Sequence, residues 1–264
     1  MSNTILFIHG AFMTPLYWEN FIGFFQERGF QCLAPAWPYR DKPIDDLRKN
    51  PPVELATLGG SEIIDYYSSM IRALSEPPIL IGHSAGGLCV QMLLDRGLGA
   101  AGVAITSGSP KGVSPLFYGS VIKSFKRLLT GGWKKVIRLS FKEFQYTFVH
   151  TLPEREQRAA YEKYVVPETR RIFLQVALAP FNSITYVNFN NDRRAPLLLI
   201  AASEDKVAPA AMNLVNFKRY QHSKAVTDFK EFAGRTHWIT VQERWEEVAD
   251  YIAHWLKQLP KGLD

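Results

Sequence analysis

The sequence predicts an α/β fold: a mostly parallel, doubly wound sheet of about six strands with a helical cap insertion. Short apolar runs alternate along the chain with segments of helical periodicity, and this order is typical of parallel strands joined by crossover helices. A serine flanked by glycines, Ser84, stands at the junction of one such run and one such helix. With 264 residues, the chain is long enough for one domain with a large buried core.

The first half of the chain contains three expected strands. Residues 4–8 form the first apolar run, residues 78–81 form the run that leads to Ser84, and residues 100–106 form the third. Between the last two, apolar residues recur with helical spacing until Gly97, a residue type that commonly ends helices. A strand, a sharp turn and a helix are therefore expected around Ser84.

Two more strands are expected in the last third of the chain. An apolar run at residues 196–202 ends just before Asp205, and Pro209 is suited to open the helix that follows. Residues 226–232 form a second candidate strand that leads to His237, and we expect the C-terminal helix to start near Ile239. Both strands therefore run into loops that carry an ionisable side chain.

A helical cap is expected between the third and fourth strands, because the interval that separates them is too long for a simple connection. We accordingly divide the chain into a first part of the α/β core, residues 1–112, a helical cap, residues 113–185, and a second part of the core, residues 186–264.

Helical patterns occur inside this cap. Ser114-Pro115 indicates a helix start, and apolar residues recur on one face until Gly131-Gly132, while Pro153 precedes a second helix with acidic residues in its first turn. Residues 113–180 carry 12 Lys and Arg against 5 Asp and Glu. That balance would suit an anionic partner, but it is also typical of the solvated faces of amphipathic helices, and we favour the second interpretation.

The segment Gly82-His83-Ser84-Ala85-Gly86 carries the clearest chemistry. A Gly-x-Ser-x-Gly sequence between a strand and a helix forms a sharp turn that exposes the serine hydroxyl at the helix N-terminus. The two glycines let the chain pass close to itself, and the helix N-terminus favours developing negative charge. Ser84 is therefore the expected nucleophile.

A serine hydroxyl needs a base, and the base needs an orienting carboxylate. The expected order along the chain is serine, acid, histidine, and Asp205 and His237 follow Ser84 in that order. Glu204 is the alternative acid, but adjacent residues after a strand point in opposite directions, and Asp205 has the Asp-x-x-x-Pro spacing. We predict Ser84, Asp205 and His237 as the catalytic residues.

An oxyanion hole requires two backbone N–H donors, one from the residue after the nucleophile and one from the loop after an earlier strand. Ala85 follows Ser84, and the loop His9-Gly10-Ala11-Phe12 follows the first strand. Ala11 and Ala85 are therefore the expected donors, with Phe12 as the alternative to Ala11.

With these motifs the chain resembles the α/β-hydrolases of the carboxylesterase type over essentially its whole length. The motifs that carry the resemblance are His9-Gly10, Gly82-x-Ser84-x-Gly86, Asp205-x-x-x-Pro209 and Gly234-x-x-His237-Trp238. The resemblance implies a Ser84–Asp205–His237 triad that hydrolyses an acyl bond. Because the first strand starts at residue 4, the chain is similar to the compact branch that holds plant methylesterases and hydroxynitrile lyases.

The resemblance implies a small-molecule ester or lactone as substrate and no cofactor. Residues near the motifs and in the cap are expected to line its pocket: Phe12, Met13, Phe125, Phe144, Phe148 and Trp238. Cys32 and Cys89 form no metal-ligand pattern. We expect neither nucleic-acid binding nor membrane insertion, and a cytoplasmic location by default, because no signal segment and no apolar stretch of about 20 residues is visible.

Two alternatives to ester hydrolysis stay open. Hydroxynitrile lyases and hydrolases of C–C bonds use the same triad, but many of the lyases carry a lysine after the catalytic histidine and a threonine in the oxyanion loop. This chain has Trp238 at the first position and Ala11-Phe12 in the second. Other proteins with this fold are ligand receptors with slow turnover, and the fold alone does not decide between these functions.

Overall fold

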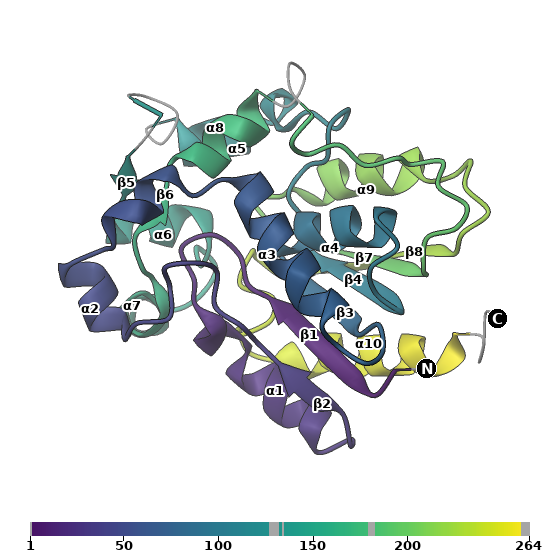
Figure 1. The fold of residues 1–264 in the computed structure, drawn as a ribbon. Helices are drawn as coiled ribbons and strands as arrows, with labels where there is room; N and C mark the ends of the chain where they lie inside the picture. Colours follow the sequence, from purple (N-terminus) through teal and green to yellow (C-terminus); the bar gives the residue numbers. More distant parts are fainter. Residues whose placement is uncertain (1, 127–131, 134, 179–182, 260–264) are drawn as a thin grey trace.

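A computed structural model gives the fold of the chain (Figure 1). It describes all residues except 1, 127–131, 134, 179–182 and 260–264. The main sheet has six strands in the order β2-β1-β3-β4-β7-β8, and all neighbouring strands are parallel. The strands are β1 Thr4–Ile8, β2 Gln31–Leu33, β3 Ile79–His83, β4 Ala101–Ile105, β7 Leu197–Ala202 and β8 Thr227–Phe232.

This sheet confirms the predicted fold class. The sequence does not predict the position of β2, because three residues are too few to show an alternating pattern and none of them is fully buried. The other five strands lie where the sequence predicts them. Their ends agree with the predicted ends within one residue, except that β3 continues to His83.

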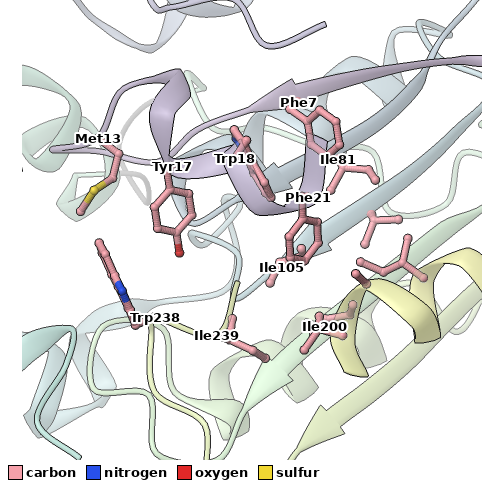
Figure 2. Close-up of a cluster of buried hydrophobic side chains, with 14 of the residues drawn as sticks. Phe7, Met13, Tyr17, Trp18, Phe21, Ile81, Ile105, Ile200, Trp238 and Ile239 are labelled. Carbon is pink, nitrogen blue, oxygen red and sulfur yellow. The ribbon is translucent and has the colours of Figure 1, made fainter. Parts of the chain in front are cut away.

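Helices cover both faces of the sheet, as Figure 1 shows. One face carries α3 Gly60–Arg72, α4 Ala85–Asp95 and α9 Ala210–Arg219, and the other carries α1 Glu19–Gln26 and α10 Trp245–Gln258. Successive strand residues point to opposite faces, so Leu6 and Leu80 pack under the first layer, whereas Phe7 and Ile81 join the second. Figure 2 shows this second cluster, in which Phe7, Trp18 and Phe21 lie together.

The direction of the connections reverses between β1 and β3. From β1 the chain moves outward to β2, returns through α3 to β3, and then continues to the opposite edge of the sheet. Open α/β sheets bind ligands at the carboxyl ends of the strands at such a reversal. Ile8 pairs with Gly82 at these ends, so the loops that follow β1 and β3 leave the sheet side by side.

The chain between β4 and β7, which we call the insertion, forms its own group of elements on the side of the molecule away from both termini (Figure 1). They are a 3-10 turn Pro115–Phe117, α5 Gly119–Phe125, β5 Val136–Ile137, α6 Phe141–Thr147, α7 Glu154–Tyr164, β6 Glu168–Thr169 and α8 Arg171–Ala177. β5 and β6 pair antiparallel, which the helical patterns did not predict. That the insertion is a cap with the boundaries 113–185 stays a prediction.

Two short helices, α2 Ile44–Lys49 and a 3-10 helix Val53–Thr57, precede α3, and another 3-10 helix, Pro15–Trp18, precedes α1. The helix predicted from Ser114 is divided: a 3-10 turn comes first, α5 ends at Phe125, and residues 127–131 lie outside the described residues.

The prediction that the C-terminal helix starts near Ile239 is wrong. The carbonyl of Trp238 accepts N–H groups from both Val241 and Gln242, and the Gln242 side chain folds back to accept the Thr236 N–H at 3.1 Å. Arg244 then has a left-handed φ of 63°, which a continuous α-helix does not contain. The helix α10 therefore begins only at Trp245.

Candidate active site

Ser84 lies in the turn between β3 and α4 and precedes the first residue of the helix. Its backbone has φ 57° and ψ −119°, a conformation that costs a non-glycine residue about 1–3 kcal/mol. The Ser84 N–H donates to the carbonyl of Ile105 at 3.0 Å, and its carbonyl accepts the Gly108 N–H at 2.9 Å. These bonds to the end of β4 hold the serine in the strained turn.

Glycines make the turn possible. A Cβ on Gly82 would lie 2.2 Å from the carbonyl oxygen of Gly86, and a Cβ on Gly86 would lie 2.1 Å from the carbonyl oxygen of Ile8. A Cβ on Gly10 would lie 2.9 Å from the Cβ of Ser84 itself. The loop after β1 is therefore packed directly against the serine turn.

His237 and Asp205 form a buried hydrogen-bonded pair. The Nδ1–H of His237 donates to Asp205 Oδ2 at 2.6 Å, and both side chains are fully buried. The N–H groups of Val207 and Ala208 donate to Asp205 Oδ1 at 2.7 and 2.8 Å, which fixes the carboxylate. His237 Nε2 is buried, and none of the described groups bonds to it, so its lone pair is available to a proton. Glu204, the alternative acid, is exposed.

His83 joins this pair to the serine turn. Its Nε2–H donates to the backbone carbonyl of His237 at 2.9 Å, and the centroids of the two imidazole rings are 4.6 Å apart. Burial, with a smaller effect of the adjacent His237, holds the pKa of His83 well below the usual range of histidine. His83 is therefore neutral, and because it directly precedes Ser84, its bond fixes the loop of His237 relative to that serine.

The two predicted oxyanion donors, Ala11 and Ala85, line the same cavity as Ser84. Phe12, the alternative to Ala11, has its N–H bonded to Glu168 Oε2 at 3.0 Å. An N–H that already donates to a carboxylate is not free to stabilise an oxyanion. Among the described residues, no hydrogen bond engages the N–H of Ala11. The geometry therefore favours Ala11 over Phe12.

The cavity beside Ser84 has a volume of about 120 Å³. Val207 and Ala208, which directly follow the carboxylate residue Asp205, contribute one part of its lining. The insertion contributes another part through Pro115, Val121, Ile122, Ile172, Phe173, Val176 and Ala177. Apart from Ser84 and Ser109, the described lining side chains are apolar, and none is charged. Such a cavity favours a neutral, apolar group.

The sequence model of the alpha/beta hydrolase family matches residues 5–251, which run from β1 into α10. The chain belongs to the α/β-hydrolase family. The match spans Ser84, Asp205 and His237, and it confirms the resemblance that the motifs indicate.

Solved structures of other α/β-hydrolases have the same fold. A monoacylglycerol lipase from Paleococcus ferrophilus is 20% identical, with 96% of this chain and 93% of that chain covered and a TM-score of 0.66. A methylesterase from Arabidopsis is 14% identical, with coverages of 97% and 99% and a TM-score of 0.68. An extracellular α/β-hydrolase from a Paenibacillus species is 21% identical, with coverages of 95% and 98% and a TM-score of 0.67. No curated protein sequence matches the chain.

Three aromatic residues predicted to line the pocket of this α/β-hydrolase pack together next to His237. Phe148 meets the His237 ring edge-on with centroids 5.1 Å apart, and it stacks on Phe144. Trp238 packs at right angles to Phe144 with centroids 5.2 Å apart. None of these three is among the described residues that line the cavity. Their contact with substrate stays a prediction, and their packing supports the loop of His237.

The other predicted pocket residues differ in position. Phe12 and Met13 are fully buried and do not belong to the described lining, but Phe12 stacks on Phe173, which does. The backbone of Phe125 ends α5, and its side chain lies outside the described residues. Sequence reasoning missed Ile172 and Val176, although their spacing of four residues would place them on one face of a helix.

Within the described ranges of the chain, no three His, Cys, Asp or Glu residues gather as a metal site would require. Among the same residues, no helix combines the length and the apolar character needed to cross a membrane.

Proposed function

We propose that this α/β-hydrolase is a serine hydrolase that cleaves a carboxylic ester or lactone through an acyl-enzyme on Ser84. The observation that carries the proposal is the buried His237–Asp205 hydrogen bond beside the strained turn of Ser84. A histidine with one nitrogen fixed by a carboxylate and the other nitrogen unbonded is suited to act as a general base.

The mechanism we propose has two acyl-transfer steps. Ser84 Oγ attacks the carbonyl carbon of the substrate while its proton passes to His237 Nε2, and Asp205 stabilises the resulting imidazolium. The N–H groups of Ala11 and Ala85 stabilise the oxyanion. His237 then returns the proton to the leaving oxygen, and an ester bond to Ser84 remains. Water repeats the sequence and releases the carboxylic acid and free Ser84.

The lining of the cavity supports a neutral ester with a small apolar group. A cavity of about 150 Å³ lined by apolar side chains holds a benzene molecule, so a volume of about 120 Å³ suits a short alkyl or small aromatic group. Two of the structurally similar proteins are by name a monoacylglycerol lipase and a methylesterase, and both names denote ester cleavage. This agrees with an ester as substrate.

A fluorophosphonate probe and a panel of p-nitrophenyl esters test the proposal. The probe should label the parent on Ser84 and fail to label Ser84→Ala, and the parent should show steady turnover with a preference for short acyl chains. Undiminished labelling of Ser84→Ala would exclude Ser84 as the nucleophile. Labelling without turnover would indicate a receptor, and cleavage of a cyanohydrin in preference to every ester would indicate a lyase.

A further inference from the structure

A buried ion pair lies behind the loop that follows β1. Arg40 pairs with Glu168 on β6 of the insertion, and both side chains are fully buried. Glu168 Oε2 accepts the Phe12 N–H at 3.0 Å, and Arg40 Nη1 donates to the Met13 carbonyl at 3.0 Å. The ion pair therefore bonds to the two residues that directly follow Ala11.

Phe12 needs such support because its backbone is strained. Its φ is 65°, in the left-handed region that bulky residues rarely occupy, and such residues persist only where their surroundings hold them. The Phe12 carbonyl also accepts the N–H of Val166, again from the insertion, at 2.9 Å. The backbone N–H and the backbone carbonyl of Phe12 are thus both bonded to residues of the insertion.

The charge of this arrangement matters for catalysis. A carboxylate bonded to the N–H next to that of Ala11 would oppose negative charge on the substrate oxygen, because charges interact strongly in a buried environment. Arg40 neutralises the carboxylate of Glu168, so the pair supplies a hydrogen-bond acceptor without leaving an unpaired negative charge.

We propose that Glu168 and Arg40 are positioning residues of the oxyanion hole, an inference that rests on the function proposed above. Glu168 holds the N–H of Phe12 away from the cavity, which leaves the N–H of Ala11 to face the oxyanion. Arg40 neutralises Glu168 and fixes the Met13 carbonyl. The insertion therefore contributes to catalysis as well as to the walls of the cavity, since it carries Glu168.

Two double variants isolate the acceptor on Phe12. Arg40→Met/Glu168→Met removes both charges and the acceptor, and buried ion pairs replaced by apolar residues often leave a folded protein. Arg40→Met/Glu168→Gln also removes both charges but keeps an oxygen that can accept the Phe12 N–H. The two variants thus differ in the acceptor and not in charge.

The readout is kcat per active site, counted by fluorophosphonate titration, together with KM and the Ki of a trifluoromethyl ketone. Ser84 Oγ adds to the carbonyl carbon of this ketone, and the serine proton passes to His237. The former carbonyl oxygen of the ketone then carries the negative charge and lies in the oxyanion hole. We expect kcat of the dimethionine variant to fall on the order of 10- to 100-fold and the Ki of the ketone to rise by a similar factor. The KM of this variant should stay within about threefold of the parent's value. The glutamine variant should retain at least about fivefold more kcat than the dimethionine variant.

Equal kcat values per active site for the parent and the dimethionine variant would overturn the inference. A raised KM at unchanged kcat would overturn it as well. A parent that hydrolyses no ester would instead contradict the proposed function, so the two failures are distinguishable. Arg171→Met/Glu62→Met is the control, because it removes a partly exposed ion pair between the insertion and the core, at 2.8 Å, and the hydrogen bonds that Arg171 makes to described residues do not reach the loop after β1. Its kcat should equal that of the parent.

Arg40→Lys keeps the test decisive if the dimethionine variant does not fold. Lysine preserves the charge that pairs with Glu168 but lacks the planar fork with which Arg40 also reaches the Met13 carbonyl. A fall in kcat of at least about threefold at unchanged KM supports the inference. An unchanged kcat contradicts it.

Discussion

Gly86 lies against the carbonyl oxygen of Ile8 so closely that a β-carbon on Gly86 would be 2.1 Å from that oxygen. The contact joins the first turn of α4 to the end of β1. It brings the turn of Ser84 and the loop of Ala11 to the same cavity. Ser84, the proposed nucleophile, and Ala11, the proposed oxyanion donor, can therefore lie close together only because Gly86 has no side chain.

Gly86→Ala should accordingly destabilise the fold. The added methyl group meets backbone atoms of a central strand, which cannot move without disturbing the sheet, so we expect the free energy of unfolding to fall by about 3 kcal/mol or more. Urea unfolding followed by circular dichroism measures it. Gly23→Ala in α1 is the control, because no atom of the described residues lies within 4 Å of the added Cβ apart from its own helix and chain neighbours, and it should raise the free energy of unfolding by up to about 1 kcal/mol. Similar effects of the two variants would contradict the prediction.

The sequence predicts Ser84, Asp205 and His237 as site residues because each of them lies in a short local motif. The turn of Ser84 depends on glycines within two residues of it, and Asp205 and His237 lie in the loops that follow β7 and β8, so short patterns suffice. The role of Glu168 could not be predicted in this way, because it lies 156 positions from Phe12 and no pattern near Glu168 indicates that contact. The start of α10 was missed because a single side chain, that of Gln242, bonds back to Thr236 in place of a helical turn.

Asp205→Asn should lower kcat by on the order of 10⁴-fold, as in the best-studied serine triad. The asparagine oxygen can still accept the N–H groups of Val207 and Ala208, but its NH₂ group then faces His237 Nδ1 and favours the wrong tautomer of the imidazole. Ester hydrolysis with counted active sites measures the loss. Glu204→Gln, which changes the exposed neighbour, should keep kcat within about twofold. A greater loss in Glu204→Gln than in Asp205→Asn would assign the role of the acid to Glu204.

Acid should destabilise the fold through His9. Its Nδ1–H donates to the Gly10 carbonyl at 2.9 Å and its Nε2 accepts the Trp37 N–H at 3.2 Å, so the folded ring is neutral. Burial, followed by the charge of Arg40, lowers the pKa of His9 to about 3. Below pH about 6.5 the unfolded chain binds a proton that the folded chain does not. The free energy of unfolding should therefore fall from pH about 6.5 towards 3, by up to about 1.4 kcal/mol per pH unit for this group.

Urea titrations between pH 7.5 and 4.5 test this pH dependence. His9→Gln should have a flatter decline in the free energy of unfolding than the parent, because glutamine takes up no proton. His222→Gln is the control, since His222 is exposed, and its decline should match that of the parent. Equal declines in the parent and His9→Gln would show that His9 does not contribute.

The preference for acyl length should depend on the α8 side chains of Ile172 and Val176, which lie between the cavity of Ser84 and a second cavity. This second cavity of about 50 Å³ adjoins the cavity of Ser84, and Leu88, Ile172 and Val176 line both. Val176→Ala shortens one of these side chains and should join the two volumes. Because one methylene in an apolar pocket changes kcat/KM by about 10-fold or more, we expect kcat/KM for p-nitrophenyl decanoate to rise about 10-fold relative to the butanoate. Val215→Ala makes the same change at an exposed position on α9 and should leave this ratio unaltered. If Val176→Ala keeps the parent's ratio while folded and active, the acyl chain does not lie along α8.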